Sequence, residues 1–335
     1  MRPRVAVIMG GYTSEHHISI KSGAVVMAHI DKDAYEVYAV HLNKDSWLVE
    51  INGHWKPIDR SDFSCDDLKF DIVFNAVHGA PGENGEIQTY FDRLNIPYTG
   101  CSAQQSSLTY NKAKTLEFLE SFGIAMAKRI VLSTNDTINT AEIVSKLGLP
   151  CFVKANQAGS SFGVSKVYKE DDLSKAIKCA FAEDNSILIE SFLEGVEVSI
   201  GVITYQGTIR VLAPTEIVTK DGFFDFSAKY EGKSEEITPA RLTEVQHHAL
   251  QVTAKKVYTA LGMKGLSRSD FIFIGDTPYF LEINTVPGLT QESLLPQQIK
   301  HAGLSLQEVF GNALAEAIEK EIHLQYETSG LSRSL

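Results

Sequence analysis

The first hundred residues alternate between strand-like and helix-like patterns, and this alternation constrains the fold more than any other feature. Three apolar runs are typical of buried strands, at residues 4–10, 35–42 and 70–79. Ser14 is expected to cap a helix that runs through about Ile30, and a second helical segment spans residues 83–94. Alternating strands and helices favour a parallel sheet with helices on both faces. The sequence therefore predicts an α/β unit at the N-terminus.

The rest of the chain continues with strands and helices, and 335 residues are more than one hydrophobic core usually organises. An α+β pattern of strands and helices follows the first unit. The last unit begins with strands that turn at Gln206-Gly207, and Asn52-Gly53 predicts a type I′ hairpin in the first. Thr238-Pro239 is expected to start a helix to Gly262, and Ser305 with Glu308 to cap the terminal helix.

Composition excludes several classes of protein. The chain is 44% apolar and 22% charged, which excludes a disordered chain, a coiled coil and collagen. Its net charge is −11 and it has no basic run, so nucleic acid and anionic membranes are not expected partners. No segment approaches the roughly 20 apolar residues of a membrane helix. The short apolar run at 5–9 ends in Gly-Gly and is interpreted as a strand rather than a signal peptide.

Cysteine spacing adds to this picture. The four cysteines lie far apart and form no CxxC pair. A reduced, cytoplasmic protein without structural zinc is therefore expected. No HExxH or GxGxxG motif is present, which argues against a zinc hydrolase and a dinucleotide-dependent enzyme.

The most informative segment runs from Arg268 to Asn284. Period-2 alternation places Arg268 and Asp270 on one face of a strand, and Glu282 and Asn284 on one face of the next. A turn about residue 276 would pair Asp270 with Glu282 and Arg268 with Asn284. Two carboxylates and an amide oxygen suit Mg²⁺, and the arginine suits a developing oxyanion. The alternative is a solvated sheet face with salt bridges.

Two further segments carry polar groups beside glycines. Lys154 ends a strand and precedes a loop rich in glycine and serine, a pattern that can cradle phosphates. That loop also matches the G-x-S-x-G nucleophile elbow at Ser161, so a serine hydrolase remains an alternative, although a strand rather than a helix follows. His78 follows a strand at the expected ligand-binding edge of the parallel sheet, or simply occupies a turn.

The ordered blocks of the chain resemble the signature segments of the D-alanine–D-alanine ligase family, a branch of the ATP-grasp superfamily. The blocks are GGYTSEHHISIKSG, HGAPGENGEIQ, PYTG, YNKAKT, VKANQAGSSFGVSKV, LIESFLEGVEVS, DFSAKY, SRSDF and EINTVPGLTQESL. They run from residue 10 to about residue 295, in family order. The resemblance implies an α/β, multidomain ATP-grasp fold: an N-terminal α/β domain at 1–102, a central ATP-grasp subdomain at 103–192 and a C-terminal one at 193–335 that holds the metal and catalytic site.

The resemblance also implies ATP as a substrate and two Mg²⁺ ions, for which Mn²⁺ can substitute. The residues expected to bind ATP are Lys112, Lys154, Glu190, Leu193, Glu197 and Lys229. The expected metal ligands are Asp270, Glu282 and Asn284, in agreement with the pattern of the hairpin itself.

The implied reaction joins two D-alanines through a D-alanyl phosphate, for peptidoglycan precursor synthesis, in a cytoplasmic homodimer. The expected catalytic residues are Glu15, Ser160, Tyr230, Arg268 and Gly288. The expected substrate-binding residues are Glu15, His78, Ser293 and Leu294.

Tyr230 bears on the second substrate. In the family that the chain resembles, a tyrosine here marks enzymes that form the dipeptide rather than a D-alanyl-D-lactate ester. An amine nucleophile is therefore expected. The alternatives are another ATP-grasp ligase with a different amino or hydroxy acid, and a nucleotide-binding module without turnover.

Overall fold

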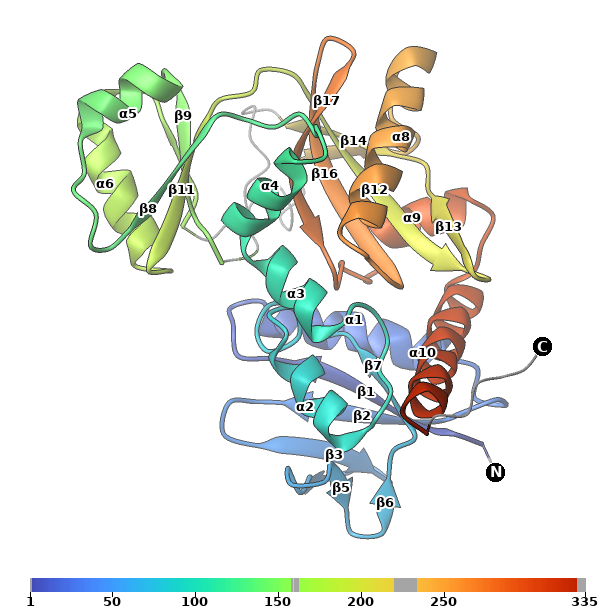
Figure 1. Ribbon diagram of the computed structural model, residues 1–335. Coiled ribbons are helices and arrows are strands. Elements are labelled where there is room, and N and C mark those ends of the chain that lie inside the picture. Colours follow the sequence, from blue (N-terminus) through green and yellow to red (C-terminus); the bar gives the residue numbers. More distant parts are fainter. Residues whose placement is uncertain (1, 158, 160–162, 220–233, 330–335) are drawn as a thin grey trace.

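The computed structural model describes residues 2–157, 159, 163–219 and 234–329 (Figure 1). Three large sheets with their helices follow one another along the chain, and a two-stranded ribbon, β5 (Ser64–Cys65) with β6 (Leu68–Lys69), lies beside the first. Among the described residues, no helix combines the length and the apolar character needed to cross a membrane.

The first sheet has the strand order β4-β3-β2-β1-β7. Its main elements are β1 (Arg4–Gly10), α1 (His16–His29), β2 (Glu36–Leu42), β3 (Trp47–Ile51), β4 (His54–Pro57), β7 (Ile72–Asn75) and α2 (Glu86–Leu94). β1 pairs in parallel with both β2 and β7, which confirms the predicted parallel arrangement, whereas β3 and β4 add an antiparallel edge. Asn52 and Gly53 have φ values of 52° and 78° and turn the predicted hairpin between β3 and β4.

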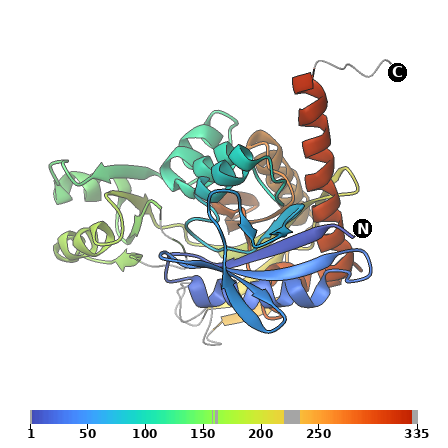
Figure 2. The ribbon, with the colours of Figure 1, turned by 90° about the horizontal axis from the view of Figure 1, so that it is seen from below.

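Both faces of the first sheet are buried. Val5 and Val7 pack in a core with Val26 of α1, whereas Ile8 packs in a second core with Phe91 of α2, so the two helices cover opposite faces (Figure 2). The terminal helix α10 (Leu306–Ser329) joins the first of these cores, where the ring of Phe310 lies 5.2 Å from that of Phe74. The far end of the chain therefore helps to build the N-terminal core.

The start of α1 differs from the prediction. The helix begins at His16, with Glu15 rather than Ser14 at its N-cap position and no side-chain cap. The reason is a turn in which the His16 N–H donates to the carbonyl of Thr13. Ser14 lies inside that turn, before the helix begins.

The second sheet has the order β10-β9-β11-β8, and all its pairings are antiparallel. Its segment comprises α3 (Ala103–Tyr110), α4 (Lys112–Glu120), β8 (Arg129–Ser133), α5 (Thr140–Leu147), β9 (Cys151–Ala155), β10 (Ser165–Val167), α6 (Glu170–Phe181) and β11 (Ser186–Ser191). Helices α5 and α6 pack on this sheet, away from the first sheet (Figure 1). Strand β10 follows β9, which argues against a strand–turn–helix nucleophile elbow; Ser161 itself lies outside the described residues.

The third sheet has the order β15-β14-β12-β16-β17, with β13 paired to β12. Its segment comprises β12 (Val196–Tyr205), β13 (Thr208–Val211), β14 (Thr215–Thr219), β15 (Ser234–Ile237), α8 (Glu244–Ala260), β16 (Leu266–Ile274), β17 (Thr277–Asn284) and α9 (Leu294–His301). The predicted turn at Gln206-Gly207 and the cap of α10, in which Ser305 and Glu308 bond to each other, are both confirmed.

The predicted helix start at Thr238-Pro239 is wrong. Helix α8 begins at Glu244, and Thr243 and Gln246 form its capping box. Thr238 is used across the sheet instead, because its hydroxyl lies 2.6 Å from that of Thr215. A side chain engaged with a neighbouring strand does not cap a helix.

Candidate active site

The β16–β17 hairpin has the register that its sequence predicts. Arg268 pairs with Asn284 and Asp270 pairs with Glu282, so the four polar side chains lie on one face. The register shifts after Asp270, because Phe271 pairs with Phe280. The opposite face is buried, and its phenylalanines and Ile283 pack in the core beneath α8. The hairpin therefore combines a buried side with a polar side.

A cavity of about 420 Å³ lies over this polar face. Its walls come from the first unit, from the third sheet and from the loop after β17. The lining residues are Glu15, Ile18, Lys21, His78, Glu83, Glu236, Arg268, Glu282, Asn284, Val286, Pro287, Gly288, Thr290, Glu292, Ser293 and Leu294. Eight of the residues predicted from the sequence are among them, although they come from opposite ends of the chain.

The charged groups of the hairpin are held by specific partners. Arg268 donates to both oxygens of Asp270, at 3.1 and 3.0 Å, and the Ser199 hydroxyl donates to Asp270 Oδ1 at 2.5 Å. Glu282 Oε2 lies 3.5 Å from Lys112 Nζ. Each carboxylate therefore has a cation beside it, which limits the mutual repulsion of the two acids.

The hairpin also offers a ligand set for a hard cation. Among the described residues, no cluster of three or more His, Cys, Asp or Glu side chains has the arrangement of a metal site. The third predicted ligand is an amide, however, and Asn284 Nδ2 is buried without a hydrogen-bond partner in the described chain. Exchanging the two ends of this amide would place its oxygen in the same position. Two carboxylates and such an oxygen fit Mg²⁺.

A second group of predicted residues lies on the central sheet. Lys154 of β9 and Glu190 of β11 form an ion pair at 2.6 Å, with only 13% and 9% of the two side chains exposed. Leu193 follows β11 and is buried. Glu197 lies on β12, opposite Ile272 of β16, and so faces the same way as Asp270.

Asn156 joins this sheet to the first turn of α4. Its carbonyl accepts the N–H of Lys112 at 3.2 Å, and its side-chain oxygen accepts the N–H of Ala113 at 2.8 Å. Asn156 directly follows the strand that carries Lys154. The structure thereby holds the segments of two predicted phosphate-binding lysines together, and one of these lysines contacts Glu282 of the hairpin.

Three predicted residues, Ser160, Lys229 and Tyr230, lie outside the described residues. The described part of the glycine-rich loop nevertheless reaches the cavity wall. A Cβ atom added to Gly159 would lie 2.5 Å from Glu15 Oε2. Backbone can approach Glu15 this closely only where no side chain intervenes.

Hydrogen bonds from the first unit hold the loop after β17. His78 Nδ1 lies 2.8 Å from the carbonyl of Val286, and its Nε2 lies 2.8 Å from Ser22 Oγ. Ser22 Oγ also accepts the N–H of Leu289. Glu83 accepts the N–H of Val286 at 3.1 Å and that of Gly79 at 2.8 Å. These bonds grip the residues on both sides of Gly288.

Ser22 and Glu83 were not predicted as site residues from the sequence. Glu83 lies in the glycine-rich block after His78. A carboxylate among glycines near a ligand-binding edge is the sequence signal that could have identified it as a site residue. Ser22 carries no comparable signal, because one serine within a helix is ordinary. Both ring nitrogens of His78 are engaged by the protein, and its role in binding substrate stays a prediction.

Burial shifts the protonation of this network. It lowers the pKa of His78, which favours the neutral ring. Because a carbonyl only accepts, Nδ1 carries the proton and donates to Val286, and Nε2 accepts from Ser22. Burial, and then the charge of Glu15, raise the pKa of Glu83 to about 7.

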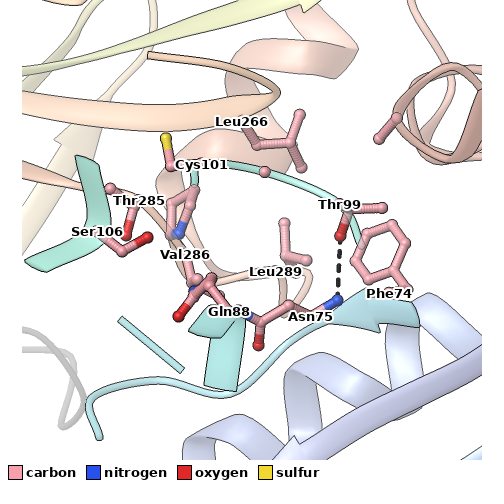
Figure 3. Close-up of a pocket in the computed structure, with 13 residues that line it drawn as sticks. Phe74, Asn75, Gln88, Thr99, Cys101, Ser106, Leu266, Thr285, Val286 and Leu289 are labelled. Carbon is pink, nitrogen blue, oxygen red and sulfur yellow. Dashed lines mark hydrogen bonds between the residues drawn. The ribbon is translucent and has the colours of Figure 1, made fainter. Parts of the chain in front are cut away.

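A second, much smaller cavity lies behind the same loop (Figure 3). Its volume of about 20 Å³ is enough for one water molecule. Gln88 and Ser106 line it, and each has a buried side-chain oxygen without a hydrogen-bond partner among the described residues. A space of this size holds neither a nucleotide nor an amino acid, so the larger cavity is the candidate substrate site.

Two family models match the chain. Residues 4–101 match "D-ala D-ala ligase N-terminus" and residues 118–314 match "D-ala D-ala ligase C-terminus". The chain is 53% identical over 315 residues to the D-alanine–D-alanine ligase of Flavobacterium johnsoniae, covering 92% of this chain and 98% of the relative. It is 49% identical over 326 residues to that of Christiangramia forsetii, covering 96% and 100%.

Solved structures agree with these matches. The D-alanine–D-alanine ligase of Coxiella burnetii superposes with a TM-score of 0.87 at 25% identity and covers 99% of both chains. The VanG D-Ala:D-Ser ligase of Enterococcus faecalis superposes with a TM-score of 0.85 at 29% identity, covering 94% and 99%. The Bacillus anthracis enzyme complexed with ATP superposes with a TM-score of 0.78 at 27% identity, covering 97% and 99%.

Proposed function

Because the chain belongs to the D-alanine–D-alanine ligase family, we propose that its large cavity is where two D-alanines are joined with the consumption of ATP. The family has the ATP-grasp fold and supplies the dipeptide for peptidoglycan precursors. One observation carries the assignment of the site: Glu15, His78, Arg268 and Ser293, from widely separated segments, line the same cavity. We take the domain boundaries to be 1–102, 103–192 and 193–335.

The first step needs a cation-lined path for ATP. A carboxylate is a poor electrophile, so its oxygen first attacks the γ-phosphate to give D-alanyl phosphate, and ADP leaves. Both reacting groups are anionic, and the positive charges of Lys112 and Lys154 would reduce their repulsion. Leu193, Glu190 and Glu197 would contact the nucleoside, as the resemblance implies.

Asp270, Glu282 and Asn284 are the residues that would hold Mg²⁺, or Mn²⁺ in its place. When bound, these ions would neutralise the charge of the phosphate groups. Arg268 lies beside Asp270 and Lys112 beside Glu282. When metal ions are bound, each carboxylate would contact both a metal ion and its neighbouring basic side chain. This assignment predicts that Asp270→Asn raises the Mg²⁺ concentration needed for half-maximal rate, which a magnesium titration would measure.

The second step needs a polar grip on each amino acid. Glu15 would hold the ammonium of the first D-alanine at the wall of the first unit. The carboxylate of the second would bind Ser293 and Leu294 at the start of α9, because the first backbone N–H groups of a helix have no partner within the helix. Once the ammonium of the second D-alanine has lost a proton, its amine attacks the acyl carbon, and the guanidinium of Arg268 and the backbone N–H of Gly288 would stabilise the oxyanion. Phosphate is then released.

The glycine-rich loop and residues 220–233 would complete the site. Ser160 and Tyr230 would join Glu15, and Lys229 would reach the terminal phosphates. Covering the cavity would protect the acyl phosphate from water. The close approach of Gly159 to Glu15 supports this arrangement for the glycine-rich loop.

We further propose a homodimer in the cytoplasm. A reducing compartment is supported by the cysteines, because none of the four forms a disulfide and three are buried. Light scattering of the purified protein would test the dimer.

The test of the function is phosphate release from ATP and Mg²⁺ with D-alanine, L-alanine, or D-alanine plus D-lactate, with products identified by mass. We expect release to require D-alanine and to yield the dipeptide. An ester as the main product would refute the assignment of an amine nucleophile through Tyr230. A folded protein that binds ATP but releases no phosphate would refute the ligase reaction.

A further inference from the structure

Glu236 lines the cavity but belongs neither to the hairpin ligand set nor to the hydrogen bonds around His78. Glu236 lies on β15, the edge strand of the third sheet, and its side chain lines the cavity with Arg268 and Ser293. Its neighbour Glu235 is exposed and points to the other face of the strand. The two glutamates therefore differ in surroundings although they are adjacent in sequence.

The register of the sheet places Glu236 on the reactive face. Glu236 pairs with Ile217 of β14, which pairs with Glu197 of β12, which pairs with Ile272 of β16. Side chains in such a row share a face, and Ile272 shares its face with Asp270 two residues earlier. Glu236 thus points the same way as the hairpin carboxylates.

The structure also places Glu236 beside the start of α9. Gln297 donates one hydrogen bond to Glu236 Oε2 and another to the carbonyl of Glu292, both at 3.0 Å. Gln297 lies one helical turn after Ser293, to which its backbone N–H is bonded. The carboxylate of Glu236 is therefore tied to the segment that would bind the second substrate. No described residue donates to its other oxygen, Oε1.

Acidic side chains lie on two different walls of the cavity. Glu15 lies on the wall of the first unit and Glu236 on the wall of the third sheet. Burial raises the pKa of Glu236, and the hydrogen bond from Gln297 and the positive charge of Arg268 partly offset that rise. The same positive charge adds to the burial that lowers the pKa of His78 on the opposite wall. Glu292 also lines the cavity, but it is exposed. Glu15 and Glu83 therefore lie on one wall of the cavity, and Glu236 is a partly buried carboxylate on the other.

We infer that Glu236 is a specificity-determining residue that binds the ammonium of the second amino acid. This inference rests on the proposed function, in which Glu15 binds the first ammonium and Ser293 the second carboxylate. A zwitterionic amino acid brings a positive group to Glu236, whereas a hydroxy acid brings none. The carboxylate thus favours an amine and disfavours an anionic hydroxy acid such as D-lactate.

Glu236→Gln tests this role, and Glu235→Gln is the matched control. Glutamine keeps an oxygen that accepts the bond from Gln297 but removes the charge. With saturating ATP and Mg²⁺, initial rates resolve the KM values of the two D-alanines, and mass analysis gives the ratio of ester to dipeptide when D-lactate competes. We expect Glu236→Gln to lower kcat/KM for the second D-alanine about ten-fold and to raise the ester ratio. The KM values for ATP and the first D-alanine should stay the same.

Two outcomes would overturn the inference. One is a Glu236→Gln enzyme with the kinetics and product ratio of the wild type and of Glu235→Gln. The other is a Gln297→Met variant with the same loss and the same product ratio, which would show that Glu236 acts only by holding α9. Circular dichroism and ATP binding confirm that each variant is folded. If the wild type makes no dipeptide, the proposed function itself fails, which is a separate result.

Discussion

Replacing Glu83 with glutamine tests how the first unit holds the loop that carries Gly288. Glu83 accepts two backbone N–H groups, from Gly79 and Val286. A glutamine side chain has one acceptor oxygen, so one of these N–H groups loses its partner. An unpaired buried donor costs about 1–3 kcal/mol. Val286 lies two residues before Gly288, and we expect kcat/KM for D-alanine to fall about ten-fold or more.

The same substitution should change how stability depends on pH. The pKa of Glu83 is raised to about 7 from an ordinary value of about 4.5, because of burial and then the charge of Glu15. Between these values the folded protein binds a proton that the unfolded chain has lost, so stability falls as pH rises through this window. At about 1.36 kcal/mol per pH unit, the full window of about 2.5 units would give a fall of about 3.4 kcal/mol. Screening in the open cavity reduces it to about 1–3 kcal/mol.

Urea unfolding at pH 5 and pH 8 would measure this effect. We expect the wild type to lose more stability than Glu83→Gln between the two values, since glutamine does not titrate. Glu86→Gln removes the same charge at an exposed position of α2 and should keep the slope of the wild type. Equal slopes in the wild type and Glu83→Gln, or an unchanged kcat/KM, would refute the role of Glu83.

Two other substitutions test other parts of the site. Lys154→Met should weaken ATP binding, as measured by calorimetry. It should also lower the free energy of unfolding by about 3 kcal/mol, because it leaves the buried Glu190 unpaired. Adding Glu190→Gln should restore part of that stability, and no restoration would argue against the ion pair. Gln298 lies on α9, and its side chain forms hydrogen bonds with Gly201, Ser199 and Thr215. Gln298→Leu should therefore lower the free energy of unfolding in urea by about 2–4 kcal/mol. A loss no larger than that of Lys300→Ala, at an exposed position, would contradict this.

Local patterns predicted the secondary structure with two informative errors. The hairpin from Arg268 to Asn284 could be predicted in register, because period-2 alternation and one turn decide which residues face each other. The helix start at Ser14 was wrong because Ser14 lies inside a turn closed by the Thr13 carbonyl and the His16 N–H. The start at Thr238 was wrong because its hydroxyl lies beside that of Thr215 on a neighbouring strand. A cap is predicted from nearby residues, whereas the bond that displaces it can come from another strand.

The sequence by itself determined which side chains share a strand face, and by resemblance which residues are expected to act in the reaction. Only the tertiary structure decided that Glu83 bonds Val286, 203 positions away, and that Glu236 reaches the start of α9 through Gln297. These contacts depend on how the sheets and α10 bury their apolar faces against one another, as Phe310 does against Phe74. That packing is a property of the whole chain, and no local pattern contains it.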